Sequence, residues 1–112
     1  MDSPRPREDT IPLHVAATTT ATSAWIEVCG EVDVSNREQL YFELAGIDLA
    51  DADVVHIDLR HLTFCDTRGC AMLVRFERAA RETGHRVHYL NARHTVRKVL
   101  CLLTPGDGPT FV

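Results

Sequence analysis

Hydrophobic and polar positions alternate over residues 24–29, the pattern of a strand with one buried face. An apolar stretch over residues 11–17 predicts a short edge strand, and the polar residues 18–23 predict the turn that joins the two. Gly30 is expected to end the second strand. The first part of the chain therefore predicts a β-hairpin.

The sequence predicts a helix after the hairpin. Ser35 and Glu38 are three residues apart, the spacing of a capping box, which predicts that a helix starts there. Leu40, Leu44 and Ile47 then recur at helical spacing. This helix should lie with its apolar face on a sheet.

The next segments repeat the order of strand and helix. The β-branched stretch 54–59 predicts a central strand, and a link over residues 60–66 leads to the strongest predicted helix, residues 68–83, which Gly84 ends. The apolar positions expected on the buried side of this helix are Met72, Leu73, Phe76, Ala79 and Ala80. The charged positions expected away from that side are Arg75, Glu77, Arg78 and Arg81.

The last elements complete an α/β pattern. Residues 86–90 predict a strand, residues 95–103 a helix, and residues 110–112 a stub of strand. We expect a flexible leader over residues 1–10 and a single domain over residues 11–112. Its fold class is α/β, with a mixed sheet of four to five strands and helices packed against it; the strands on either side of helix 68–83 should run parallel.

Composition and charge narrow the function classes. The chain has 112 residues, of which 45% are apolar and 25% charged, which suits one globular domain. Its net charge of −4 gives no overall positive field, so we expect no direct contact with nucleic acid. The longest apolar runs, Cys70–Val74 and Val99–Leu103, are far shorter than the roughly 20 residues of a membrane span, and no signal peptide pattern follows the first residues. These features predict a cytoplasmic protein without membrane contact.

Cysteine and histidine spacing gives no metal motif and implies no cofactor. The four cysteines form no Cys-x-x-Cys pair and are expected to be buried thiols: Cys29, Cys65, Cys70 and Cys101. The six histidines form no pair at metal-binding helical spacing: His14, His56, His61, His85, His88 and His94.

The most informative segment is residues 63–70, between a predicted strand and a predicted helix. Phe64 is expected to anchor it in the core, Asp66 to accept the free amides of the helix, and Gly69 to allow close approach of another backbone. Thr67 then lies at a helix N-terminus with its hydroxyl on the surface. A phosphate there would be tolerated by the helix dipole and would act outward, by repelling an acidic partner surface.

Two motifs resemble the STAS domain of anti-sigma factor antagonists. Residues 26–33, with Gly-Glu-Val-Asp at their end, are similar to the family's strand followed by Gly-Glu-Leu-Asp. Residues 55–59 and then 64–69, with Asp-Thr-Arg-Gly, are similar to its strand, loop and Asp-Ser-Ser-Gly or Asp-Ser-Thr-Gly turn. The likeness extends over residues 11–103.

The resemblance implies a regulator, not an enzyme. Unphosphorylated proteins of this kind bind an anti-sigma factor that is also a serine/threonine kinase, so that a sigma factor is released, and phosphorylation ends the binding. Carried over by position, Thr67 is the phosphate acceptor, and Asp33 and Asp66 lie near the phosphate. The residues expected to contact the partner, together with the exposed side of the following helix, are Glu31, Asp33, Asp66, Arg68, Gly69 and Cys70.

Three positions depart from the family pattern. Thr67 replaces the more usual serine, which keeps the hydroxyl but adds a methyl group. Arg68 replaces a small polar residue and can pair with a phosphate or with an acidic partner. Cys70 stands where an aliphatic residue is common. These differences bear on which kinase would recognise the chain.

Several alternatives stay open from the sequence. Thr67 can be an unmodified first-turn hydroxyl, and the chain can be a non-phosphorylated scaffold in a larger signalling complex. Cys65 and Cys70 flank Thr67 and can form a redox gate, or one of them can be a nucleophile with His61 or His94 as its base. A basic cluster can be a solvated helix face or touch an acidic partner or nucleic acid: Arg93, His94, Arg97 and Lys98.

Overall fold

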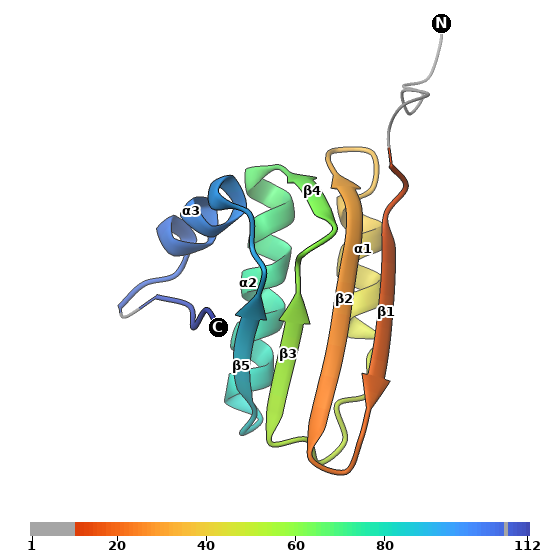
Figure 1. Cartoon of the computed structure of the whole chain (residues 1–112), viewed down its shortest axis with the longest axis vertical. Helices are drawn as coiled ribbons and strands as arrows, with labels where there is room; N and C mark the ends of the chain where they lie inside the picture. Colours follow the sequence, from red (N-terminus) through yellow and green to blue (C-terminus); the bar gives the residue numbers. More distant parts are fainter. Residues whose placement is uncertain (1–10, 107) are drawn as a thin grey trace, which may run out of the picture.

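The computed structural model describes residues 11–106 and 108–112, so the leader predicted over residues 1–10 lies outside the described residues. It confirms the α/β class: the chain forms a five-stranded mixed sheet and three helices, of which two cover one face of the sheet and the third packs against one of these two (Figure 1). The strands are β1 (His14–Thr19), β2 (Ser23–Val32), β3 (Val54–Asp58), β4 (Leu62–Cys65) and β5 (Arg86–Leu90). The helices are α1 (Arg37–Ala45), α2 (Thr67–Glu82) and α3 (His94–Leu103).

The sheet has the order β1-β2-β3-β5. β4 lies outside this order and pairs with the C-terminal end of β2, beyond the part of β2 that pairs with β3. β1 and β2 form the expected antiparallel hairpin, whereas β2, β3, β4 and β5 pair in parallel. The C-terminal stub is present as a single parallel bridge between Tyr89 and Phe111. All the parallel strands therefore end at the same edge of the sheet, where the connections to the helices begin.

β2 is longer than the predicted strand, because Gly30 does not end it. Gly30 has a φ of +101°, and a β-carbon there would lie 2.2 Å from the carbonyl oxygen of Pro12. The register shifts between Gly30 and Glu31, so glycine marks a bulge inside the strand. The strand then continues to Val32, and this last part of β2 pairs with β4.

β4 was not expected, because residues 60–66 were predicted to form a link. Leu62 and Cys65 are buried, but Phe64 is 49% exposed, so the prediction that Phe64 anchors this segment in the core is wrong. The strand is held by backbone pairing with β2 and by the Thr63 hydroxyl, which donates to the carbonyl of Gly30 at 3.2 Å. A strand of only four residues leaves too little alternation to be read from its pattern.

The core lies between the sheet and the helices. Alternate residues of the central strands point into it, and α2 packs between α1 and α3. Fully buried core side chains include Ile26, Val28, Val55, Ile57, Leu73 and Leu100. Within residues 11–106 and 108–112, no helix covers the opposite face of the sheet (Figure 1).

One charged residue of α2 lies on the buried side, contrary to the prediction for it. Glu77 is 3% exposed, and its carboxylate accepts a hydrogen bond from the Tyr89 hydroxyl at 2.9 Å and pairs with Arg81 Nε at 3.0 Å. These partners compensate for the desolvation of the charge. Burial and the neighbouring Glu77 carboxylate raise the pKa of Tyr89 well above its ordinary value.

Within the described residues, none of the helices has the length and apolar character that crossing a bilayer requires.

Candidate functional site

The two motifs singled out in the sequence meet at the edge where β2 and β4 end. Val32 pairs with Cys65, and the backbone N–H of Asp66 donates to the carbonyl of Val32 at 3.0 Å. Parallel pairing thus brings the Gly-Glu-Val-Asp segment next to the Asp-Thr-Arg-Gly turn. The unexpected strand β4 is what joins them.

Asp66 caps α2, as predicted. Its Oδ1 accepts a hydrogen bond from the backbone N–H of Gly69 at 2.7 Å, and its carbonyl accepts one from Cys70 N–H at 2.9 Å. The carboxylate satisfies one of the amides that a helix leaves free at its start.

Asp66 also pairs with a residue that the sequence did not single out. Its Oδ2 lies 3.3 Å from Nε of Arg37, the first residue of α1, and the two side chains are only 28% and 20% exposed. Partial burial limits the screening of this pair by solvent. The ion pair fixes the start of α1 to the start of α2.

Thr67 is the first residue of α2, and its side chain is exposed, as expected. Arg68 beside it is also exposed. A negatively charged group on the Thr67 hydroxyl would lie at the positive end of the helix dipole, one residue before the exposed Arg68. A group added at this exposed position would face solvent instead of the core.

Gly69 and Cys70 face inward, unlike the residues before them. A β-carbon at Gly69 would lie 2.6 Å from Cγ1 of Val32 and 2.8 Å from Sγ of Cys65, so only glycine lets α2 approach the strand ends this closely. Cys70 is fully buried. Gly69 has no side chain and the Cys70 side chain is buried, so neither offers a side chain to a partner in this arrangement, and both position the turn instead. The predicted contact residues that solvent reaches are Glu31, Asp33, Asp66 and Arg68.

The loop after β2 is ordered by a set of local hydrogen bonds. Asn36 donates through Nδ2 to the carbonyl of Glu31 at 2.8 Å and accepts from Asp33 N–H at 2.9 Å. Asp33 accepts from the backbone N–H of Ser35 at 2.9 Å and from its hydroxyl at 2.5 Å. Glu31 and Asp33 are both half-buried beside the start of α1.

The predicted capping box is wrong. α1 begins at Arg37, with Asn36 in the N-cap position, and the Ser35 hydroxyl donates to Asp33 instead of accepting from the helix. Asn36 and Arg37 are the site residues that the sequence did not reveal. The sequence offered only a weak indication of the role of Asn36, since asparagine near a helix start often bonds to neighbouring backbone. It offered none for Arg37, because its partner Asp66 is distant in the sequence.

The thiols differ in burial, contrary to the prediction that all four are buried. Cys65 and Cys70 are buried, Cys29 is half-buried and Cys101 is exposed. The hydrogen bond between the two buried thiols is the largest cause that raises the pKa of Cys65, and burial is the second. The same hydrogen bond lowers the pKa of Cys70. A nucleophile must reach its substrate, and neither of these two sulfurs lies on the surface.

Within the described part of the chain, histidine, cysteine and carboxylate side chains do not gather in threes as a metal ion would require. The predicted basic cluster is exposed on and before α3. None of its members belongs to the elements that form the Thr67 turn.

Comparisons with known proteins agree with this geometry. The family model described as "Mlab, STAS domain" matches residues 15–104. The solved structure of the anti-sigma factor antagonist SpoIIAA in its unphosphorylated form is similar at a TM-score of 0.66 and 22% identity, over 90% of this chain and 88% of that one. The phosphorylated form of SpoIIAA from Bacillus gives a TM-score of 0.65 at 20% identity, over 90% and 91% of the two chains.

A larger protein contains the same fold. The murine Solute Carrier 26 family member A9 anion transporter matches at a TM-score of 0.61 and 16% identity, over 79% of this chain but only 14% of its own. No curated protein sequence matches the chain significantly. At these identities, the structural likeness shows the fold.

Proposed function

Since the chain belongs to the STAS domain family, whose model spans residues 15–104, we propose that it is an anti-sigma factor antagonist switched by phosphorylation of Thr67. Its partner is an anti-sigma factor with serine/threonine kinase activity, and it regulates transcription indirectly, in the cytoplasm, without contacting nucleic acid. The chain itself is not an enzyme and needs no cofactor. The observation that carries the proposal is the exposed Thr67 hydroxyl on the first residue of α2.

Two features support a switch at this position. The helix dipole and Arg68 lower the energetic cost of a phosphate there, so the modification leaves the fold intact. The added charge, about −1.5 to −2 at neutral pH, instead changes the surface that a partner meets. The phosphate therefore repels carboxylates of a partner that approach the exposed Thr67 and Arg68.

The modification is tested by mass. Protein isolated from its native cells should carry one phosphate, mapped to Thr67, and purified protein should acquire it from the anti-sigma factor and ATP. Thr67→Ser should still accept phosphate and Thr67→Ala should not. A phosphate mapped only to other residues would exclude the switch.

Binding is tested with charge variants. Thr67→Ala should bind the anti-sigma factor like the wild type, whereas Thr67→Glu should bind at least about tenfold more weakly because of charge repulsion. Thr95 provides the matched control, because it is also an exposed threonine in the first turn of a helix, α3. Equal affinity of Thr67→Glu and Thr95→Glu would contradict the proposal.

A non-phosphorylated scaffold in a larger signalling complex is the second candidate function. The observation that favours it is the same fold within a transporter chain of which it occupies 14%. A stable large complex in native cells, without a kinase subunit and with unmodified Thr67, would support this candidate.

A further inference from the structure

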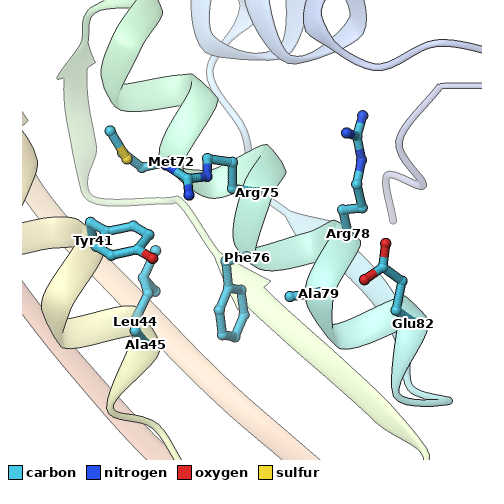
Figure 2. A pocket seen from close by; sticks show the side chains of 9 residues that line it. All are labelled: Tyr41, Leu44, Ala45, Met72, Arg75, Phe76, Arg78, Ala79 and Glu82. Atoms are coloured by element: carbon cyan, nitrogen blue, oxygen red, sulfur yellow. The ribbon is translucent and has the colours of Figure 1, made fainter.

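A groove separates α1 from α2 on the helical side of the molecule. It has a volume of about 330 Å³. Leu44 of α1 and Met72, Phe76 and Ala79 of α2 form its apolar floor, and Figure 2 shows Phe76 lying between the two helices. Ala79 is exposed and Met72 and Phe76 are half-buried, so solvent reaches this floor.

One end of the groove points towards the Thr67 turn. Arg68, Met72, Phe76 and Ala79 follow one another at helical spacing and lie along one side of α2. Both helices start at the edge of the sheet where β2 and β4 end, and Arg37 pairs with Asp66 there. The Met72 end of the groove is therefore the end nearer to Thr67, which lies five residues before Met72 on the same helix.

The rim of the groove is positively charged, although the whole chain carries a net charge of −4. Arg75 and Arg78 line it, and both are exposed (Figure 2). The Arg75 guanidinium lies 4.9 Å from the centre of the Tyr41 ring on α1, which holds it across the groove in a cation–π contact. Arg68 adds a third exposed arginine at the Thr67 end, and Glu82 is the acidic residue at the other end.

We propose that the α1–α2 groove binds an acidic amphipathic helix of a protein partner. An apolar stripe at positions i, i+3, i+4 and i+7 fits the floor, and methionine adapts to its shape. Carboxylates beside the stripe pair with Arg75 and Arg78, whose guanidinium groups bind carboxylates in a two-pronged geometry. The exposed side of α2 is itself rich in arginine, so α2 of a second copy does not supply such a helix. A second copy of the chain is one outcome of the test below.

The regulation of this contact rests on the proposed function. A phosphate on Thr67 would place negative charge beyond the Met72 end of the groove and repel an acidic helix that extends past that end. The groove thus connects a modification at the start of α2 with binding along its length, and no movement of the fold is needed.

The test uses two synthetic peptides of roughly 16 residues, about four helical turns. Both carry leucine on the stripe, and their polar positions are glutamate in one and lysine in the other. Amide resonances of the full chain are followed as each peptide is added. The glutamate peptide should shift amides of residues 40–45 and 72–79, and the lysine peptide should not.

Variants separate the groove from other cationic surfaces. Arg75→Glu with Arg78→Glu should weaken binding of the glutamate peptide at least about tenfold, and Ala79→Glu should do the same by placing a charge on the floor. Lys98→Glu is the control, because Lys98 is an exposed cation on α3, outside the groove. These positions are exposed, so the variants should fold, which their amide spectra confirm directly.

The outcomes separate the two proposals. Shifts confined to α3, equal binding of both peptides, or equal losses in Lys98→Glu and the groove variants would overturn the groove proposal. Self-association of the chain that the groove variants abolish would also overturn it, in favour of a second copy. Loss of peptide binding in Arg75→Glu with Arg78→Glu but not in Thr67→Glu would support the groove and contradict its regulation by Thr67.

Discussion

Asp66 and Arg37 join the two helices that flank the proposed switch, through an ion pair of 3.3 Å between Oδ2 and Nε. The other oxygen of the same carboxylate caps α2 at the N–H of Gly69. One side chain therefore positions Thr67 from two directions. Asp66 is therefore the first residue to replace.

Replacing Asp66 should destabilise the protein. Asp66→Ala removes the cap and the ion pair and should lower the free energy of unfolding by about 1–2 kcal/mol. Asp66→Asn keeps a capping oxygen and should cost roughly half as much. Urea denaturation measures both, with Asp51→Ala as the control, since Asp51 is exposed and lies in a turn. Equal stabilities of Asp66→Ala and Asp51→Ala would show that the cap contributes nothing.

Two glycine substitutions should have opposite effects. Gly69→Ala forces a methyl group against Val32 and Cys65 and should destabilise the fold by about 1–3 kcal/mol. Gly46 has a right-handed backbone with φ of −82°, and its nearest neighbour to an added β-carbon is 3.4 Å away. Gly46→Ala should therefore be neutral or stabilise by up to about 1 kcal/mol. Thermal unfolding of both variants checks the sign, and a stable Gly69→Ala would contradict the close approach.

Stability should fall on mild acidification because of His56. Its ring stacks on Trp25 with centroids 4.0 Å apart and lies 5.8 Å from the ring of His88. Burial lowers the pKa of His56 below its ordinary value of 6.5, and the charge of the nearby His88 lowers it further. Below pH 6.5 the unfolded chain therefore binds more protons than the folded chain, so the free energy of unfolding decreases as the pH falls towards the folded-state pKa.

The measurement compares urea unfolding at about pH 7.5 and about pH 5. His56→Gln should lose part of the acid-induced decrease, whereas His94→Gln, at an exposed position, should keep all of it. An unchanged decrease in His56→Gln would assign the effect to other groups.

The thiols should react in order of access. Cys101 is exposed and should be alkylated first by iodoacetamide at about pH 8. Burial and the hydrogen bond that the Cys29 thiol donates to Glu27 raise the pKa of Cys29 to about 11, so it should react slowly. Cys65 and Cys70 should react only on unfolding, because both are buried. Mass mapping over time tests the order, and Cys101→Ser should remove the fast phase.

Fast labelling of Cys65 or Cys70 in folded protein would contradict their burial. It would also revive the redox gate and the cysteine nucleophile as explanations for the two thiols beside Thr67.

Much of the site could be predicted from neighbouring residues. Asp66 caps the amide three residues ahead, and Thr67 is exposed because it follows that cap, so both depend on contacts within one turn of chain. The partner of Arg37 could not be predicted, because Asp66 is far along the chain and reaches Arg37 only after β2 and β4 pair.

Periodicity along the chain determined the helices, the long strands and the α/β class, since helical and strand repeats record which face of each element is buried. Tertiary packing alone decided that Gly30 lies inside a strand, that residues 62–65 form β4, and that Glu77 is buried against Tyr89. It also decided that Gly69 and Cys70 face inward and that a cationic groove opens beside α2. Each of these depends on atoms distant in sequence that meet only when the sheet and helices close around one core.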